Sequence, residues 1–597
     1  MLYSKLCETY EELEKNPSRL KKTEILSEFL KTIKHEKHRE IIYLLQGRVW
    51  PDYEEKEFGI STQLTIKALS KATGINEKEV VKKWKKIGDL GKVAEEITKS
   101  KSQHTLFSAN LTTYKVLENL KALPELAGKG TVEKKIGLIA ELLTSAKPIE
   151  AKYIARTLLN DLRIGIGSGT LRDSIVWACF DKEDKDSYEK VQSAYDKVTD
   201  FAVVFEKAIK GKNELEKIEL SPGQPLKVML ALKADSISEG FERAGKPCAF
   251  EYKYDGFRML ITKDKGGNIK VFTRRLDEVT KQFPEVKDYA TKFVKADTFI
   301  IDSEAVGYDP KTKRYTSFQD ISQRIKRKYD IDKMAKELPI EINVFDILYY
   351  DGKSMIDEPF EKRTKLLRKI IKEEKLKFRT SEQLITDDEK KAEKFYKQAL
   401  KEGEEGVMIK NLQSHYKPGA RVGDMLKLKP ASNELDLVIV GAEYGTGKRG
   451  GWLSSFDIAC RDEETGDFLD IGKVSTGIKE KEDSEKKEEN ARDFTSLNEK
   501  GKTSGVSREK DGTTYEDMTK LLKPLITSEK GKTVRIKPKI VITVIYQDIQ
   551  GSPSYNSKFA LRFPRFIALR TDRSVDDIAT LGEIEKAHKK ALLMRQF

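Results

Sequence analysis

The sequence predicts a multidomain α+β protein with an all-α domain, then an α+β domain, then a β-barrel domain. A chain of 597 residues is too long for one hydrophobic core of ordinary size. Apolar residues recur at helical spacings of three and four up to about residue 215. From about residue 225, short strand-like runs separated by Gly and Asp turns replace that pattern. We therefore expect domains at 1–215, 216–430 and 431–597.

The predicted all-α domain, 1–215, is defined by its apolar periodicity. Leu26, Phe29 and Leu30 lie on one face of a helix, because three- and four-residue spacings return to the same side. The segment 221–225, Ser-Pro-Gly-Gln-Pro, cannot continue a helix. It predicts the joint to the next domain.

A glycine-rich segment at 162–173 interrupts these helices. Thr170 and Asp173 have the spacing of a capping box, which predicts a new helix starting at Thr170. Free backbone amides at a helix start bind phosphate well, and Arg163 and Arg172 flank the segment. A plain connector between two helices is the alternative.

The α+β domain contains the most informative segment, 251–258, Glu-Tyr-Lys-Tyr-Asp-Gly-Phe-Arg. It predicts a strand ending in an Asp-Gly turn. Since alternate side chains of a strand share a face, Glu251, Lys253 and Asp255 point one way and their aromatic neighbours the other. A lysine in this setting is a candidate covalent nucleophile, and a salt-bridged surface lysine is the alternative. Carboxylates favour the ammonium form, so burial and nearby cations must favour the reactive amine.

The third domain, 431–597, is predicted from short strands at 435–440, 456–459 and 540–546. The pattern resembles an OB-fold, a barrel that often binds nucleic acid. Residues 479–511 interrupt it and are mostly Lys, Glu, Asp, Ser, Gly and Asn. Because such a composition cannot bury a core, we expect a mobile surface loop there.

The composition points to a polyanionic partner and away from a membrane. A formal net charge of +14 suits nucleic acid, and the 98 acidic residues imply that the basic surface is segregated. No run of eighteen apolar residues occurs, and the N-terminal sequence lacks the apolar stretch of a signal peptide. The four cysteines include no C-x-x-C pair, which argues against a zinc ribbon or finger. We expect a soluble, cytoplasmic monomer with reduced thiols.

A series of motifs in chain order gives the sequence a family resemblance. They lie at 253–258, 272–278, 299–305, 344–352, 405–410, 425–429 and 561–573. The first, Lys-Tyr-Asp-Gly-Phe-Arg, resembles the lysine motif of the covalent nucleotidyltransferases. The complete set resembles the ATP-dependent DNA ligases of the archaeal and eukaryotic replicative type. A P-loop is excluded, because no Gly-Lys-Ser/Thr triplet has a glycine five residues before its own glycine.

The resemblance implies the reaction. Lys253 would attack the α-phosphate of ATP and form lysyl-AMP with release of pyrophosphate. The AMP would pass to the 5′-phosphate at a nick, and the 3′-hydroxyl would then displace it, as needed in DNA replication, repair and recombination. Glu304 and Glu405 would hold Mg²⁺, or Mn²⁺ in its place, since Mg²⁺ takes one or two carboxylates together with waters and phosphate oxygens. The motifs leave open whether ADP, GTP or NAD can replace ATP.

The resemblance also implies the nucleotide contacts. Phe345 would stack on adenine, and Glu251 would read its amino group. Two arginines would lie near the ribose and phosphates, Arg258 and Arg274. The other implied nucleotide contacts are also cations: Arg421, Lys427 and Lys429 from the second domain, and Arg570 delivered by the OB-fold.

Two partners follow from the same resemblance. Residues 1–215 would hold nicked double-stranded DNA by its minor-groove backbone, and such contacts position a duplex without reading its sequence. The segment Gln103–Phe107 loosely matches the sliding-clamp segment of related ligases, with Leu106 and Phe107 as an apolar anchor pair. A loop that buries these two residues in its own domain is the alternative.

Three other classes share part of the pattern. A capping or RNA-joining nucleotidyltransferase would need neither the helical N-terminus nor the segment Arg562–Arg565. An NAD-dependent ligase is disfavoured by the missing zinc cysteines. A nucleic-acid clamp with a decayed site is disfavoured by the intact motif residues Lys253, Glu304 and Lys427. The chain departs from the family pattern at three positions: Met425 for tryptophan, Thr543 for glutamate and Arg573 for lysine.

Overall fold

The fold is taken from a computed structural model of the chain. It describes residues 1–36, 39–54, 56–100, 110–126, 128, 130–316, 318–325, 327, 329–430, 433–446, 449–480 and 513–596, without the side chains of 318–320, 322 and 590–596. Two predictions lie outside these ranges: the segment Gln103–Phe107 entirely, and the loop 479–511 from residue 481 onwards.

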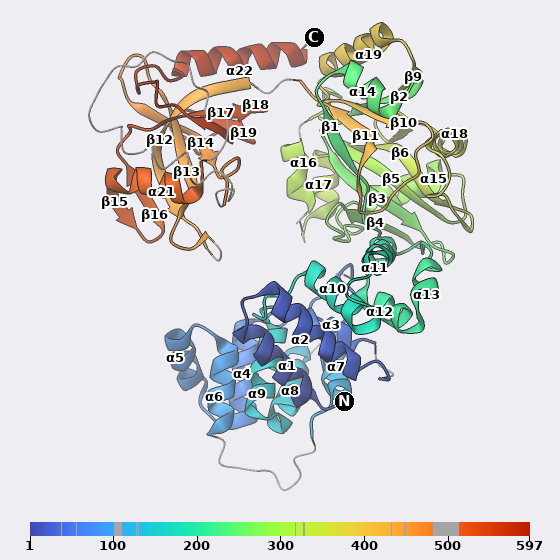
Figure 1. The fold of residues 1–597 in the computed structure, drawn as a ribbon, viewed down its shortest axis with the longest axis vertical. Helices are drawn as coiled ribbons and strands as arrows, with labels where there is room; N and C mark the ends of the chain where they lie inside the picture. Colours follow the sequence, from blue (N-terminus) through green and yellow to red (C-terminus); the bar gives the residue numbers. More distant parts are fainter. Residues whose placement is uncertain are drawn as a thin grey trace. The chain divides into compact units, whose positions relative to one another are not determined.

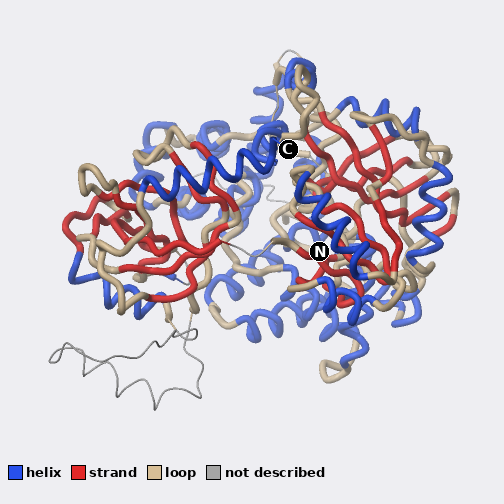
Figure 2. The backbone as a smooth tube through the Cα atoms, turned by 90° about the horizontal axis from the view of Figure 1, so that it is seen from above, coloured by secondary structure: helices blue, strands red, loops and turns tan. Residues whose placement is uncertain are grey.

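The chain divides into two compact units. The first comprises Met1–Phe395 with Val407–Leu428, and the second comprises Tyr396–Gly406 with Lys429–Phe597. Helices dominate the start of the first unit, and strands dominate the rest of the described chain (Figure 2). The predicted multidomain α+β class is therefore confirmed.

Residues 3–216 form helices without a strand between them in the described ranges (Figure 1). Their buried apolar faces build one hydrophobic cluster that reaches from Tyr3 to Ile218. Among the described helices, none combines the length and apolar character that crossing a bilayer requires. The helices are α1 (Tyr3–Lys15), α2 (Arg19–Thr32), α3 (Ile41–Leu45), α4 (Thr62–Thr73), α5 (Glu77–Ile87), α6 (Leu90–Lys99), α7 (Thr113–Ala122), α8 (Thr131–Ser145), α9 (Pro148–Leu158), α10 (Ser168–Cys179), α11 (Lys185–Val198), α12 (Phe201–Lys210) and α13 (Lys212–Glu216).

Local signals explain where these helices begin and end. The Ser18 and Ser61 hydroxyls cap α2 and α4 by accepting from backbone amides, and Gly74 ends α4 in the left-handed conformation. The predicted capping box at Thr170 is wrong, because α10 begins at Ser168 with Gly167 as its N-cap. The glycine-rich segment therefore supplies the helix start itself.

The remainder of the first unit contains two sheets in its described residues. Sheet A has the strand order β1 (Leu230–Ala234), β11 (Arg421–Leu428), β10 (Gly406–Asn411), β2 (Cys248–Lys253) and β9 (Gln383–Thr386). Sheet B has the order β4 (Ile269–Thr273), β3 (Phe257–Lys263), β5 (Phe299–Gly307), β6 (Ile340–Tyr350) and β7 (Lys353–Ser354), and β8 (Phe378–Thr380) pairs with β6. The accompanying helices are α14 (Ile237–Ala244), α15 (Pro284–Phe293), α16 (Phe318–Ile325), α17 (Ile331–Glu337), α18 (Phe360–Ile370) and α19 (Glu389–Lys401).

Sheet B has two faces of different chemistry. On β3 and β5, Met259 and Ile301 belong to the apolar cluster that also contains Phe293 of α15. The alternate positions carry the charged pair Arg258 and Asp302, and beside them the apolar Leu260 and Ile300 of a second buried cluster. Buried charges on this face need partners, and two residues predicted from the sequence, Arg258 and Glu304, lie opposite each other on it.

In the second unit, the main sheet curls around one long strand, β12 (Asn433–Tyr444). The first half of β12 pairs with β17 (Val541–Tyr546) and its end pairs with β16 (Thr533–Ile536), while β13 (Leu453–Arg461) lies along its other edge. The other elements are β14 (Phe468–Val474), β15 (Ile526–Lys530), β18 (Asp548–Gly551), β19 (Phe559–Arg562), β20 (Arg565–Leu569), α21 (Tyr515–Leu522), the 3₁₀ turn η2 (Lys523–Leu525) and α22 (Leu581–Gln596). The helix α22 packs on β18, and the backbone oxygen of Ile549 lies 2.8 Å from Nδ1 of His588.

Candidate active site

Lys253 is the last residue of β2 and is half-buried. The aromatic side chains on the other face of β2 are covered: Phe250 contacts Phe241 of α14 and Tyr252 contacts Phe395 of α19, with ring centroids 5.3 and 4.9 Å apart. The turn after Lys253 is pressed against β5, since a Cβ on Gly256 would lie 2.2 Å from the backbone oxygen of Ala305. Only glycine fits there, so the turn that follows the lysine has little freedom.

Glu251, two residues before Lys253, is tied to a lysine that we did not assign from the sequence. Its carboxylate lies 2.7 Å from Nζ of Lys410 on β10, and both side chains are almost completely buried. The Nε2 of Gln383 donates to the same carboxylate at 2.8 Å. Lys410 Nζ also lies over the Phe345 ring, 4.8 Å from its centroid, and so brings Glu251 and Phe345 together. Lys410 is the last residue of the motif at 405–410, and this position in the motif was the sequence signal that could have identified it.

Arg258 on β3 is held in place by hydrogen bonds to buried partners. Its guanidinium donates to the buried Asp302 carboxylate at 2.8 and 2.5 Å, and to the backbone oxygen of Met229 at 2.7 Å. The Tyr416 hydroxyl donates to Asp302 at 2.8 Å. Burial disfavours the charge on the guanidinium, but Asp302, Tyr416 and Glu304 together outweigh burial, and the pKa of Arg258 is raised. Its guanidinium carbon lies 5.4 Å from the Phe345 ring centroid, so a fixed cation borders the stacking residue.

Glu304 lies on β5 directly across from Arg258 on β3 and from Asn343 on β6. The Asn343 side chain is fully buried, and its amide nitrogen and oxygen have no hydrogen-bond partner among the described residues. The amide oxygen of Asn343 and the carboxylate of Glu304 are oxygen ligands. Such ligands suit a hard cation that keeps part of its water shell. The described residues contain no group of three or more His, Cys, Asp or Glu side chains placed for a metal.

The remaining predicted residues of the first unit lie after β4 and on β11. Arg274 follows β4 and is exposed. Lys427 is half-buried on β11, paired with Lys233 of β1 and Met408 of β10. Arg421 begins the same strand and is exposed. The register of β11 is irregular between them: Arg421 lies opposite Leu230 of β1 and Lys427 lies opposite Lys233. Since these β1 partners are only three residues apart, the fold brings positions 421 and 427 to within about 10 Å of each other.

Glu405, Lys429 and Arg570 belong to the second unit. Glu405 pairs with Lys429 at 2.5 Å. Arg570, after β20, pairs with Asp572 at 2.7 Å and with Asp436 of β12 at 3.0 Å. The hydrogen bond from Arg570 lowers the pKa of Asp572 to about 2.

Asp436 was not identified from the sequence. Besides Arg570 it pairs with Arg573 at 3.1 Å, and it accepts a hydrogen bond from the Thr543 hydroxyl at 2.5 Å. Two of the three departures from the family pattern, Thr543 and Arg573, therefore meet at one carboxylate. A carboxylate within a strand offers no sequence signal of its own, because its partners arrive from β17 and from the segment after β20.

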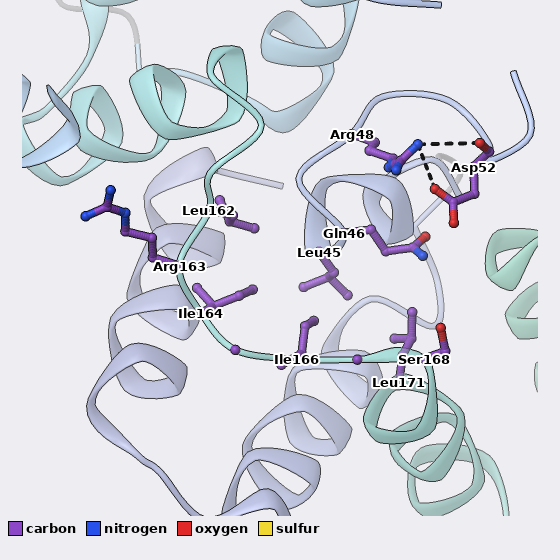
Figure 3. A pocket seen from close by; sticks show the side chains of 12 residues that line it. Leu45, Gln46, Arg48, Asp52, Leu162, Arg163, Ile164, Ile166, Ser168 and Leu171 are labelled. Atoms are coloured by element: carbon purple, nitrogen blue, oxygen red, sulfur yellow. Dashed lines mark hydrogen bonds and ion pairs between the residues drawn. The ribbon is translucent and has the colours of Figure 1, made fainter. Parts of the chain in front are cut away.

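The glycine-rich segment borders a cavity of about 280 Å³ in the helical region (Figure 3). Ile164 and Ile166 face this cavity, whereas Arg163 points away from it. Arg163 pairs with Asp161 at 2.7 Å and Arg172 pairs with Asp173 at 2.6 Å. The two predicted flanking arginines are therefore already engaged with carboxylates.

Comparison with known proteins covers nearly the whole chain. Family models match in order: DNA ligase N terminus at 2–176, ATP dependent DNA ligase domain at 228–429, and ATP dependent DNA ligase C terminal region at 449–573. The DNA ligase of Nanoarchaeum equitans is 43% identical over 590 residues, covering 99% of this chain and 98% of that protein. The DNA ligase of Thermococcus onnurineus is 39% identical over 591 residues, again covering 99% and 98%. Among solved structures, Pmar-Lig_PreS3 has a TM-score of 0.49 at 18% identity and covers 94% of this chain and 99% of its own.

The chain belongs to the ATP-dependent DNA ligase family. It is an enzyme that uses ATP to seal nicks in DNA. The family resemblance that we inferred from the ordered motifs is thereby confirmed.

Proposed function

We propose that Lys253 is the nucleophile that carries AMP. Its Nζ forms a bond to the α-phosphorus of ATP, the bond to the β-phosphate oxygen breaks, pyrophosphate leaves, and Nζ loses its proton. The observation that carries this assignment is the position of Lys253 at the end of β2, two residues beyond a buried Glu251 and beside a turn that Gly256 locks against β5. A positioned nucleophile matters because phosphoryl transfer depends mainly on alignment and charge stabilisation.

The adenine contacts that we propose are Phe345 and Glu251. Phe345 is half-buried, with cations near its ring from Lys410 and Arg258. Glu251 has its carboxylate fixed by Lys410 and Gln383 and can accept from an adenine amino group. Other proposed nucleotide contacts are Arg258, Arg274, Arg421, Lys427, Lys429 and Arg570.

We propose Glu304 and Glu405 as the carboxylates that hold Mg²⁺, with Mn²⁺ as a substitute. The oxygen-rich setting of Glu304 beside Asn343 fits a cation of this class. When bound, the ion neutralises charge on the phosphate oxygens. The protein side chains supply the remaining positive charge through Lys427 and Lys429.

We also propose the three-domain division and its roles. Residues 1–215 hold nicked DNA, 216–430 carry the nucleotide chemistry, and 431–597 form an OB-fold. The curl of the second unit around β12, with partners on both of its edges, supports a barrel. From the sequence we also propose that the protein is a cytoplasmic monomer and that it binds a sliding clamp through Gln103–Phe107.

The test separates the nucleophile from the rest of the site. Lys253→Ala and Lys253→Arg should both abolish transfer of label from α-labelled ATP to protein, because an alanine has no amine and a guanidinium stays protonated. Both variants should still bind nicked DNA and should seal a nick that already carries 5′-AMP. Substantial labelling of either variant at wild-type rates contradicts the assignment. Failure to seal the pre-adenylated nick shows instead that the substitution damages the fold of the site.

A further inference from the structure

Lys22 on α2 is a buried lysine that reaches the glycine-rich loop, residues 162–167. Only 8% of its surface is exposed. Its Nζ donates to the backbone oxygen of Ile164 at 2.5 Å and to that of Gly165 at 3.1 Å. The close fit leaves no room for a side chain on Gly165, where a Cβ would lie 2.6 Å from Nζ and where φ is +63°. One ammonium group therefore fixes two successive peptide groups of the loop.

This contact decides where the loop amides point. In a planar trans peptide, the N–H lies on the side opposite to the carbonyl oxygen. With the carbonyls of Ile164 and Gly165 turned towards Lys22, the N–H groups of Gly165 and Ile166 face away from it. Within the described ranges, neither amide donates a hydrogen bond to the protein. They form a pair of open donors directly before the start of α10.

The charge on Lys22 is also uncompensated. No carboxylate of the described residues forms an ion pair with its Nζ, and burial lowers its pKa. The neighbouring lysine differs in both respects: Lys21 is half exposed and pairs with Glu24 at 2.9 Å. A buried cation behind outward-facing amides strengthens the attraction of that surface for an anion.

We infer that Lys22 is a positioning residue for DNA binding, which fixes the glycine-rich loop so that the amides of Gly165 and Ile166 face a backbone phosphate of the nicked duplex. The inference rests on the proposed role of residues 1–215 in holding DNA. Lys22 acts from behind the loop through its two carbonyl contacts. The phosphate is met by the amides, so the contact is independent of sequence.

The experiment compares Lys22→Met with the matched control Lys21→Met in the full-length protein. Lys22→Met keeps the length of the side chain and removes the ammonium. It should weaken binding to a nicked duplex about tenfold, the usual scale for losing a charge-assisted contact. It should raise KM for nicked DNA without lowering kcat, leave self-adenylation unchanged, and abolish DNA-induced protection of amides 162–168 from hydrogen exchange. Lys21→Met should match the wild type in every readout.

A second variant separates loop positioning from loss of charge or stability. Gly165→Ala keeps Lys22 but displaces the loop from it, so it should reproduce the binding defect. The double variant Lys22→Met/Gly165→Ala should bind no more weakly than either single variant, because both remove the same contact. Additive losses, or normal nick affinity of either folded variant, overturn the positioning role.

A third variant tests the loop itself. Gly167 is the N-cap of α10 with extended backbone angles, and a Cβ there meets no atom within 4 Å. Gly167→Asp therefore suits the helix, since aspartate is a favoured N-cap, yet its charge repels a phosphate. Normal nick affinity of Gly167→Asp removes the loop from DNA binding and refutes that part of the proposed function. Weak binding of Gly167→Asp together with normal binding of Lys22→Met refutes only the role of Lys22.

Discussion

The buried pair of Glu251 and Lys410 shows how one residue contact links the nucleotide motifs. Lys410 touches Glu251, the backbone oxygen of Phe345 and the rings of Phe345 and Phe360. The lysine charge is balanced by one carboxylate and two aromatic faces. Removing one partner of such a pair leaves the other charge buried without compensation.

Lys410→Met should destabilise the protein by about 3 to 5 kcal/mol, the usual cost of breaking a buried ion pair. It should also raise KM for ATP in self-adenylation, because Glu251 loses its fixed position. Urea unfolding and labelling kinetics measure the two effects. Glu251→Gln/Lys410→Met is the control: it should recover much of the stability but not the activity. Full stability of the single variant contradicts the buried pair.

Asp196 on α11 gives a pH dependence of stability. It lies against Gly419 and accepts from Gln192 at 2.9 Å, with the charges of Lys227 and Arg172 nearby. Burial raises the pKa of Asp196 to about 6. The pKa of aspartate in an unfolded chain is about 3.9, so the folded state binds the proton more tightly. The bound proton stabilises the folded state. This stabilisation is complete when the pH is below the pKa of the unfolded chain, and it is lost as the pH rises through about 6.

Asp196→Asn should therefore raise the melting temperature more at pH 7.5 than at pH 4. The asparagine imitates the protonated carboxyl group, which is the favoured form at low pH. The gain in the free energy of unfolding should differ between the two pH values by up to about 3 kcal/mol, because the pKa is higher by about two in the folded state. Calorimetric scans of both proteins at the two pH values provide the measurement. An equal effect at both values means that Asp196 titrates normally.

At the scale of elements, the segment after β20 is organised by β12. Asp436 of β12 holds Arg570 and Arg573 together, and Asp572 holds Arg570 from the other side. The cations are kept in a defined place by one carboxylate of β12 and one of their own segment. A cation presented to departing pyrophosphate helps most in the transition state, where negative charge grows on the leaving group.

Arg570→Ala and Asp572→Ala should slow self-adenylation about tenfold or more, the usual scale for one lost transition-state contact. Sealing of a pre-adenylated nick should suffer much less, since no pyrophosphate leaves in that step. Arg573→Ala is the matched control, because it contacts the same Asp436 but departs from the family's lysine; we expect a smaller effect. Single-turnover measurements of each step distinguish these outcomes. Equal losses in both steps place the segment in DNA contact or in folding.

At the scale of the whole molecule, the helical region and the sheet-containing region of the first unit are in contact. Tyr53 packs in an apolar cluster with Leu226 and Met229, and the Lys227 amide donates to the backbone oxygen of Asp196 at 2.8 Å. These contacts join the proposed DNA-binding domain to the proposed adenylation domain. Loss of the helices should therefore have a cost in stability.

Removal of residues 1–215 should leave self-adenylation but weaken binding to nicked duplex. The dependence of binding on salt should become shallower, because fewer counterions are released from the phosphates. Titrations at several salt concentrations test this, and circular dichroism checks that the shortened protein is folded. If the truncated protein binds a nick as tightly as the full chain and with the same salt slope, the DNA contacts lie elsewhere.

The sequence by itself determined the class of this protein, because its motifs are local. Lys253 and Gly256 lie within one strand and turn, and the period-two pattern around them predicts which side chains share a face. The same locality explains the helical N-terminal region and the multidomain α+β class. Helix starts were less well predicted: the chemistry of Thr170 and Asp173 fits a cap, but Gly167 occupies that position.

Only the tertiary structure decided which charges meet. Lys410, Asp302, Tyr416 and Asp436 become partners of motif residues from strands and loops far away in the chain. Lys22 meets the glycine-rich loop across more than 140 positions. Sequence spacing carries no information about such pairs, because burial and ion pairing depend on where strands and helices pack. The residues that we propose for the chemistry are thus local in sequence, while the residues that hold them in place are assembled by the fold.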